Sequence, residues 1–137
     1  MINDDKNKKL NYSQGVVFGV FDDLHPGHEY FLREAEKRCD KLVVCITQSE
    51  IVELFKKHPP KYSLDERISK IKEYNQDFVI MPGDLILGEW SVFKKYPSSI
   101  VFLGHDQQRI SEELKKMDIP FIFLEAHHPE KYKSSLL

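Results

Sequence analysis

The chain has 137 residues, of which 41% are hydrophobic and 31% are charged, and its formal net charge is -2. This length suits one domain with a real core, and the near-neutral charge argues against a dedicated nucleic-acid-binding protein, which carries a clear basic excess. No apolar run approaches the roughly 20 residues needed to span a bilayer, so we expect no membrane association and a cytoplasmic location.

The N-terminus is polar and lysine-rich, which predicts a flexible tail over residues 1–14 rather than a signal peptide. Residues 15–137 contain no internal repeat, linker or break in composition, and we expect a single domain there. Cys39, at the end of the first predicted helix, and Cys45, in an apolar run, fit reduced thiols better than a disulfide.

Short β-rich runs alternate with helical patterns, as in βαβ units around a parallel sheet. Strands are expected at Val16–Phe21, Lys41–Thr47, Phe78–Met81, Ile100–Leu103 and Phe121–Leu124. Helices are expected over Glu29–Cys39 and over Ile86–Tyr96. Two more helices are expected where apolar residues recur at helical spacing: Leu64, Ile68 and Ile71 form one stripe, and Ile110, Leu114 and Met117 form the other. Ser63 and Glu66 have the spacing of a capping box. The order predicts an α/β, Rossmann-like fold: an open, doubly wound sheet of about five parallel strands, with the first strand central and helices on both faces.

The most informative stretch follows the first predicted strand and reads Gly19-Val-Phe-Asp-Asp-Leu-His-Pro-Gly-His28. It places His25 and His28 at a helix N-terminus, where free backbone N–H groups and the helix dipole attract anions. Gly19 and Gly27 allow the backbone to approach a ligand closely. The plainer alternative is that His25 caps a turn and that His28 is a surface residue in the first helical turn.

A second polar run, Gly104-His-Asp-Gln107, follows the fourth predicted strand. In doubly wound sheets, ligands bind beyond the carboxyl ends of the strands, where the strand order reverses. The two runs are therefore expected to converge on one cleft. Because the sequence has neither a G-x-G-x-x-G after the first strand nor a P-loop, phosphate binding would depend on the histidine turn.

The stretch from Gly19 to His28 resembles the G-T-F-D-x-x-H-x-G-H signature of the cytidylyltransferase-like nucleotidyltransferases. That family includes glycerol-3-phosphate cytidylyltransferase, pantetheine-phosphate adenylyltransferase and the archaeal FAD synthases. The resemblance implies an enzyme that transfers the nucleoside monophosphate of ATP or CTP to a small phosphorylated acceptor and releases pyrophosphate. Implied acceptors are FMN, a sugar phosphate or a polyol phosphate. Mg²⁺ would be bound mainly through the triphosphate, and since relatives are commonly dimers a homodimer fits the resemblance.

The resemblance also implies roles for individual residues. His25, His28 and Lys56 would be catalytic, with Lys57 and Lys61 as alternatives to Lys56. The nucleotide-binding set would be Gly19, Val20, Phe21, Asp22, Gly27, Gly104, Asp106, Gln107, Ser134 and Ser135. Lys57 and Arg67 would bind the substrate, although Arg67 is equally consistent with a structural role. Asp22 is expected to orient a metal-bound water or the backbone of the turn.

The chain departs from the family pattern at three points. Val20 replaces the usual Thr or Ser, Asp23 stands where an apolar residue is common, and the sequence ends two residues after Ser135, without the helix which that motif usually opens. These departures leave open an alternative, a non-catalytic nucleotide-binding member of the same fold. Gln107 resembles the archaeal FAD-synthase-like branch and slightly favours ATP over CTP.

Overall fold

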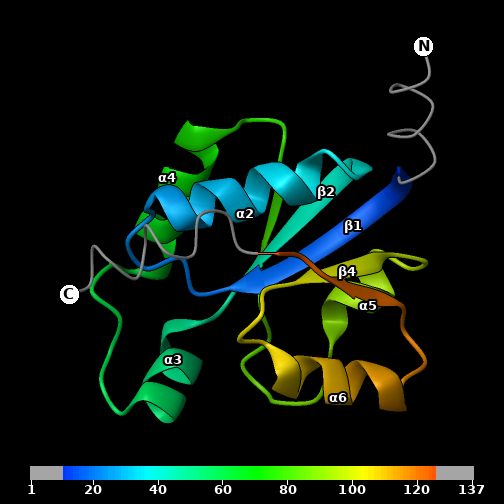
Figure 1. The fold of residues 1–137 in the computed structure, drawn as a ribbon. Coiled ribbons are helices and arrows are strands. Elements are labelled where there is room, and N and C mark those ends of the chain that lie inside the picture. The colour runs from blue at the N-terminus through cyan, green and yellow to red at the C-terminus, as the bar shows by residue number, and fades with distance from the viewer. Residues whose placement is uncertain (1–10, 126–137) are drawn as a thin grey trace.

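A computed structural model describes residues 11–125 (Figure 1). Its centre is a parallel five-stranded sheet in the order β3-β2-β1-β4-β5. The strands are β1 (Tyr12–Gly19), β2 (Cys39–Ile46), β3 (Val79–Pro82), β4 (Ile100–Leu103) and β5 (Phe121–Phe123). The predicted α/β, Rossmann-like sheet with a central first strand is confirmed.

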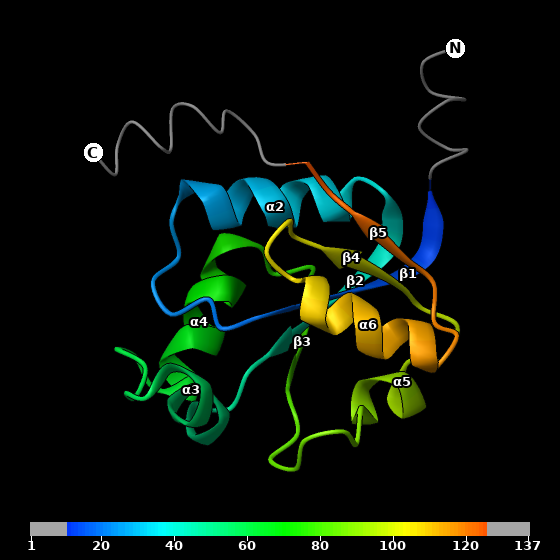
Figure 2. The ribbon, with the colours of Figure 1, turned by 60° about the horizontal axis from the view of Figure 1, so that its bottom comes forward.

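The helices are α2 (Pro26–Glu36), α3 (Ser49–Lys56), α4 (Leu64–Tyr74), α5 (Ser91–Lys95) and α6 (Gln108–Lys116). Helices α2 and α4 cover one face of the sheet, and α5 and α6 cover the other (Figure 2). Helix α3 directly follows β2, beyond the carboxyl end of that strand. Within residues 11–125, no helix is long and apolar enough to cross a membrane.

The central strands supply apolar side chains to both layers of the core. Val17 and Val44 are fully buried beneath α2 and α4, whereas their neighbours Val16 and Val43 are fully buried beneath α5 and α6. Successive side chains of a strand point to opposite faces, so a strand covered on both faces is apolar throughout. These short apolar runs are therefore what made the strands recognisable in the sequence.

The boundaries of β1, α2 and β2 differ from the predicted ones. Strand β1 begins at Tyr12, which pairs with Cys39, so residues 12–14 lie in the sheet and not in a flexible tail. The strand ends at Gly19, and Phe21 lies outside it with a left-handed φ of 49°. Helix α2 ends at Glu36, and Cys39 opens β2 instead of closing the helix.

Two helices differ from the sequence expectations. No helix was predicted at α3, which is only 8 residues long and whose Leu54 and Phe55 side chains are 53% exposed. The helix expected over Ile86–Tyr96 is restricted to α5. Gly88 and Trp90 have positive φ angles of 88° and 50°, which a continuous α-helix cannot contain.

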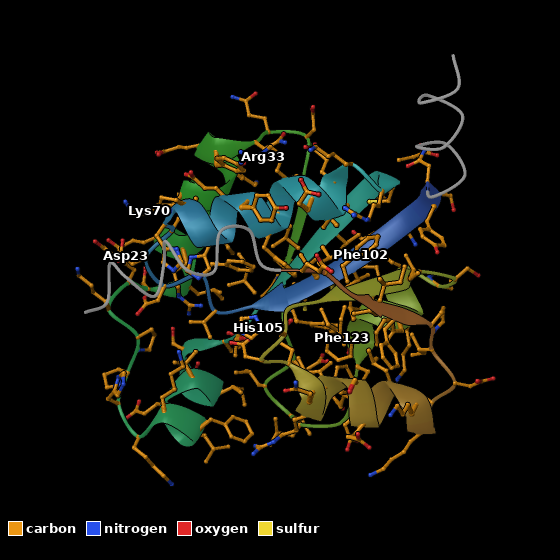
Figure 3. All side chains as sticks on the ribbon, in the orientation of Figure 1. Asp23, Arg33, Lys70, Phe102, His105 and Phe123 are labelled. Atoms are coloured by element: carbon orange, nitrogen blue, oxygen red, sulfur yellow. The ribbon has the colours of Figure 1, made fainter. Side chains whose placement is uncertain are left out.

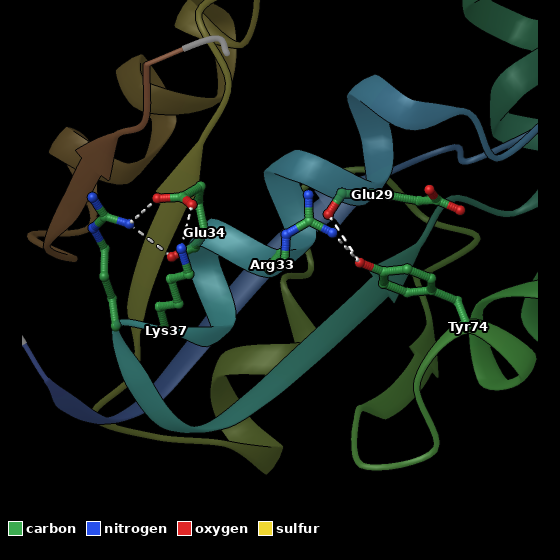
Figure 4. Close-up of polar contacts among 6 residues, drawn as sticks. Glu29, Arg33, Glu34, Lys37 and Tyr74 are labelled. Atoms are coloured by element: carbon green, nitrogen blue, oxygen red, sulfur yellow. Dashed lines mark hydrogen bonds and ion pairs between the residues drawn. The ribbon is translucent and has the colours of Figure 1, made fainter.

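Polar side chains fix helix α2 against α4 (Figure 4). Arg33 Nη1 donates to Tyr74 Oη at 3.3 Å, and Tyr74 Oη donates to the Glu29 carbonyl oxygen at 3.2 Å. Near the end of α2, Asn75 Nδ2, at the C-terminal end of α4, donates to Glu36 Oε2 at 2.9 Å, while Glu34 pairs with Lys37 within the same helix at 3.0 Å. The helix whose N-terminus carries the two histidines is thus attached to α4 at two points.

Candidate active site

The two polar segments predicted to converge do lie at one edge of the sheet. Strands β1 and β4 are parallel neighbours, and the strand order reverses between them. Gln107 joins the two segments, because its Oε1 accepts from Gly104 N and its Nε2 donates to the Phe18 carbonyl oxygen, both at 2.9 Å. Figure 3 shows Asp23 and His105, one from each segment, at this edge.

His25 and His28 form a reciprocal cap at the start of α2. The Nδ1 atom of His25 accepts from the backbone N–H of Gly27 at 3.0 Å and from that of His28 at 3.4 Å. His28 Nδ1 in turn accepts from His25 N at 3.4 Å. The capping role weighed as the plainer alternative is therefore present in the structure, in the form of a capping box built from imidazoles.

This cap decides which ring nitrogen can contact a ligand. A backbone N–H can only donate, so the Nδ1 atom that receives it carries no proton. The proton of each neutral ring is then on Nε2, which makes Nε2–H the donor of both rings. The cap and the anion-binding role of the histidines are compatible because they use different nitrogens.

Burial and the neighbouring His25 lower the pKa of His28 from 6.5 to about 4, against the opposing effect of the Asp23 backbone and charge. A neutral imidazole still donates one hydrogen bond. His28 is therefore neutral near pH 7 and can donate one hydrogen bond, at the helix end where the positive end of the α2 dipole favours anions.

Glycines make room for the rings of the histidine turn. A Cβ atom on Gly19 would lie 2.6 Å from the ring of Phe21, and one on Gly27 would lie 2.9 Å from Cε1 of His25. The Phe21 ring in turn packs edge-on against His28, with 5.4 Å between ring centroids. Any side chain at Gly19 would displace Phe21 and, through it, His28.

The lysines expected to contact phosphates lie at the end of α3 and in the segment between α3 and α4. Lys56 is the last residue of α3, and its charge acts on both Asp22 and His28. Lys57 follows it in a left-handed conformation, with φ of 69°. Lys61 Nζ lies 3.9 Å from Asp23 Oδ2, and both side chains are about two-thirds exposed. All three lysines are exposed, and Lys56 and Lys61 interact with charged or titratable groups of the histidine turn.

Arg67 is fully buried, and its guanidinium contacts protein groups on all sides. It donates to the carbonyl oxygens of Val20, Thr47 and Tyr62 and to Ser49 Oγ, at distances from 2.8 to 3.1 Å. Such a side chain has little capacity left for a substrate, so the structural alternative explains it better than the substrate-binding role. Its bonds join the segments that follow β1 and β2 to α4.

The other residues predicted to bind the nucleotide have different surroundings. The carbonyl oxygen of Val20 accepts a hydrogen bond from Arg67. The Asp106 side chain is exposed, and its Oδ1 lies 3.3 Å from the position that a Cβ atom on Gly104 would occupy. The Gln107 amide is occupied by the link between β1 and β4. Ser134 and Ser135 lie outside the described residues.

An apolar pocket that the sequence did not reveal opens at the carboxyl edge of the sheet, on the face that α5 covers. Its volume is about 140 Å³, and its walls include Phe18, Thr47, Ile86 and Trp90. Thr47 N donates to the Gly19 carbonyl oxygen at 3.0 Å, so one wall of the pocket is bonded to the start of the turn. The apolar run 85–87 was the available signal, but a helix was expected there.

A larger pocket, of about 330 Å³, lies at the opposite edge of the sheet. It is lined by residues that precede or begin strands, including Gln14, Ser99 and Pro120. Sheets of this kind bind their ligands at the carboxyl edge. The smaller pocket is therefore the relevant one for the chemistry of the histidine turn.

An open parallel sheet with polar segments beyond the carboxyl ends of its strands is the architecture of a doubly wound α/β protein, which binds its ligands at the switch point. A model of the family described as Cytidylyltransferase-like matches residues 16–137. The chain belongs to this family, and it is a nucleotidyltransferase.

Named relatives and solved structures agree with this assignment. The chain is 36% identical to the FAD synthase of Pyrococcus horikoshii over 104 residues, which cover 74% of this chain and 68% of the relative. It is 33% identical to the FAD synthase of Thermococcus sibiricus over 135 residues, which cover 96% and 88%. Among solved structures, the lipopolysaccharide core biosynthesis protein from Thermoplasma volcanium matches with a TM-score of 0.68 and 23% identity. The match covers 84% of this chain and 96% of that protein, and it supports the fold.

Proposed function

We propose that this protein is an FMN adenylyltransferase, which transfers the AMP unit of ATP to the phosphate of FMN and forms FAD and pyrophosphate. The single observation that carries the proposal is the 33% identity to an FAD synthase over 96% of the chain. The paired imidazole donors and an apolar pocket at the same edge of the sheet support it with chemistry that the substrates would require.

In the proposed reaction, an oxygen of the FMN phosphate attacks the α-phosphorus of ATP. A new P–O bond forms, the bond to the oxygen bridging the α- and β-phosphates breaks, and pyrophosphate leaves with the electron pair. A phosphate monoester is largely ionised at pH 7, with a second pKa of about 6, so no general base is needed. The protein would contribute alignment and charge stabilisation.

His25 and His28 would direct their Nε2–H groups at the oxygens of the α- and β-phosphates, in front of the N-terminus of α2. Because the capping bonds fix both rings through Nδ1, these donors would be oriented before substrate binds. Preorganised donors of this kind stabilise a transition state without the cost of reorientation. Lys56 would reduce the repulsion between the two negatively charged substrates.

The apolar pocket is the proposed site for part of the isoalloxazine ring system. Phe18 and Trp90 pack edge to face at 5.6 Å between centroids and form one wall, and the exposed Ile86 and Leu87 form the lip. At about 140 Å³ the pocket is smaller than the roughly 300 Å³ of a typical small-ligand site. It would therefore take the dimethylbenzene end and leave the polar end outside. Most of the lining residues are apolar, and Thr47 and Asp84 are the polar side chains among them.

Mg²⁺ is the expected cofactor, and it neutralises triphosphate charge when bound. Among residues 11–125, no group of three or more His, Cys, Asp or Glu side chains is placed to hold a metal ion. Mg²⁺ commonly binds through substrate phosphates, water and one or two carboxylates, and the open edge at the histidine turn suits such a complex.

The proposal is tested by measuring pyrophosphate release with ATP or CTP, each combined with FMN, glycerol 3-phosphate or a sugar phosphate, in the presence of Mg²⁺. We expect turnover with ATP and FMN to exceed every other pair by at least 100-fold. A preference for CTP, or for a polyol or sugar phosphate, would reject FMN adenylylation while leaving a nucleotidyltransferase. Nucleotide binding without pyrophosphate release from any pair would favour a non-catalytic member.

A further inference from the structure

We infer that Asp22 is a positioning residue, whose carboxylate fixes the segment 58–62 across the histidine turn and so places Lys61 for contact with substrate phosphate. Asp22 Oδ2 accepts from Lys61 N at 2.7 Å, and Asp22 Oδ1 accepts from Tyr62 N at 2.9 Å. The role of Lys61 rests on the proposed function, whereas the attachment of the segment does not.

The segment has little other support. It joins α3 to α4 without helix or strand and contains Pro59 and Pro60, which have no backbone N–H to donate. Among the described residues, the backbone of this segment makes three hydrogen bonds to other elements: two to the Asp22 carboxylate and one in which Arg67 Nε donates to the Tyr62 carbonyl oxygen. The Asp22 carboxylate thus joins two parts of the chain 39 and 40 residues apart.

Asp22 is charged when it makes these bonds. Burial alone would raise the pKa of Asp22, but the N–H groups of Lys61 and Tyr62 and the charges of Arg67 and Lys56 bring the pKa below its ordinary value. Hydrogen bonds to an ionised acceptor are about twice as strong as neutral ones. An asparagine has similar shape but only one acceptor oxygen, so it would place an NH₂ group against one of the two N–H donors.

Lys61 is the side chain that the attachment would position most directly. Its own N–H is one of the two bonded groups, and its ammonium lies 5.4 Å from the centroid of the Tyr62 ring. The pairing of Lys61 with Asp23, at 3.9 Å between exposed groups, is too weak to occupy this ammonium. A triphosphate at the histidine turn would compete for it successfully.

Limited digestion of the full chain with trypsin tests the attachment without reference to activity. In Asp22→Asn, we expect cleavage after Lys57 and Lys61 to be at least 5-fold faster than in the wild type, at a temperature well below the melting temperature of both. Asp23→Asn is the matched control in the same turn and should be cleaved at the wild-type rate. Wild-type cleavage of Asp22→Asn, or equally fast cleavage of Asp23→Asn, would overturn the inference.

A double-mutant cycle of Asp22→Asn and Lys61→Ala tests the role in turnover. If Asp22 acts through Lys61, each variant lowers kcat/KM by about 10-fold, and the double variant lowers it by about 10-fold rather than 100-fold. The Mg²⁺ concentration for half-maximal activity should not change in Asp22→Asn. Additive losses, or a raised Mg²⁺ requirement that would mark Asp22 as a metal ligand, would overturn the inference. If wild-type protein does not form FAD, the proposed function fails while the digestion result stands.

Discussion

The imidazole rings of His25 and His28 stack with 3.7 Å between their centroids and an angle of 20° between their planes. Each ring also accepts a backbone N–H of the other residue. The two rings therefore form one packed unit, with both Nδ1 atoms directed into the helix cap and the proton of each neutral ring on Nε2. This arrangement allows capping and catalysis to be separated by substitution.

His25→Asn should separate the two roles. An asparagine is a good N-cap, so it keeps the bond to the first turn of α2, but it lacks the Nε2–H group. We expect kcat to fall by at least 100-fold, with a melting temperature within about 2 °C of the wild type. His25→Ala should show the same loss of kcat and, in addition, lose about 1 kcal/mol of stability. Wild-type turnover in His25→Asn would remove the ring from the mechanism.

The low pKa of His28 predicts a pH dependence of stability. Because the folded protein holds the pKa of His28 near 4, it binds fewer protons than the unfolded chain between pH 6.5 and 4. The free energy of unfolding is therefore highest above pH 6.5 and decreases as the pH falls towards 4. His28→Gln keeps a capping-box residue at this position and should show a smaller decrease in the free energy of unfolding over that range.

NMR titration of His28 provides the direct measurement of this pKa. We expect a midpoint near 4 in the free protein and a higher midpoint when a triphosphate is bound, because the ligand's negative charge favours the protonated ring. A midpoint near 6.5 in the free protein would contradict the neutral-donor role.

Arg67→Met should destabilise the fold. The substitution keeps most of the apolar volume but leaves the carbonyl oxygens of Val20, Thr47 and Tyr62 without the donor that now satisfies them. Since each buried unpaired group costs about 1–3 kcal/mol, we expect a total loss of about 3 kcal/mol or more in chemical denaturation. A stable Arg67→Met protein with weakened substrate binding would instead support the role first predicted from the sequence.

Ile86→Ala tests the apolar pocket, with Leu85→Ala as its control. The two residues are neighbours in one loop with similar exposure, 63% and 57%, but only Ile86 lines the pocket. If the flavin enters the pocket, Ile86→Ala should raise the KM for FMN by about 5-fold, the effect of roughly 1 kcal/mol of lost apolar contact, and leave the KM for ATP unchanged. Equal effects of the two substitutions, or no effect of either, would remove the flavin from this pocket.

The sequence was informative where one local pattern determines the structure. Buried strands between helices appear as short apolar runs, so the strands were predictable from residues such as Val16 and Val43, and the right-handed crossover rule placed the first strand at the centre. The cap of α4 was equally local, since Ser63 Oγ accepts from Glu66 N at 3.1 Å and Glu66 Oε1 accepts from Ser63 N at 3.0 Å, as their spacing predicts.

Features that depend on distant contacts were not predictable in this way. The bonds that Asp22 accepts from Lys61 N and Tyr62 N, and the bond that Arg67 donates to Val20, join segments far apart in sequence, so no spacing rule shows them. The pocket around Trp90 was hidden for another reason. Its loop is apolar enough to suggest a helix, and only the backbone angles at Gly88 and Trp90 show that the helix starts later.

The most direct test of the central claim is to incubate the protein with FMN, Mg²⁺ and ATP labelled at the α-phosphate, and to separate the products by chromatography. We predict that the label appears in FAD, in an amount equal to the pyrophosphate released, and that His25→Asn forms FAD at least 100-fold more slowly. Pyrophosphate release without labelled FAD, or label transferred only to an acceptor other than FMN, would contradict the claim.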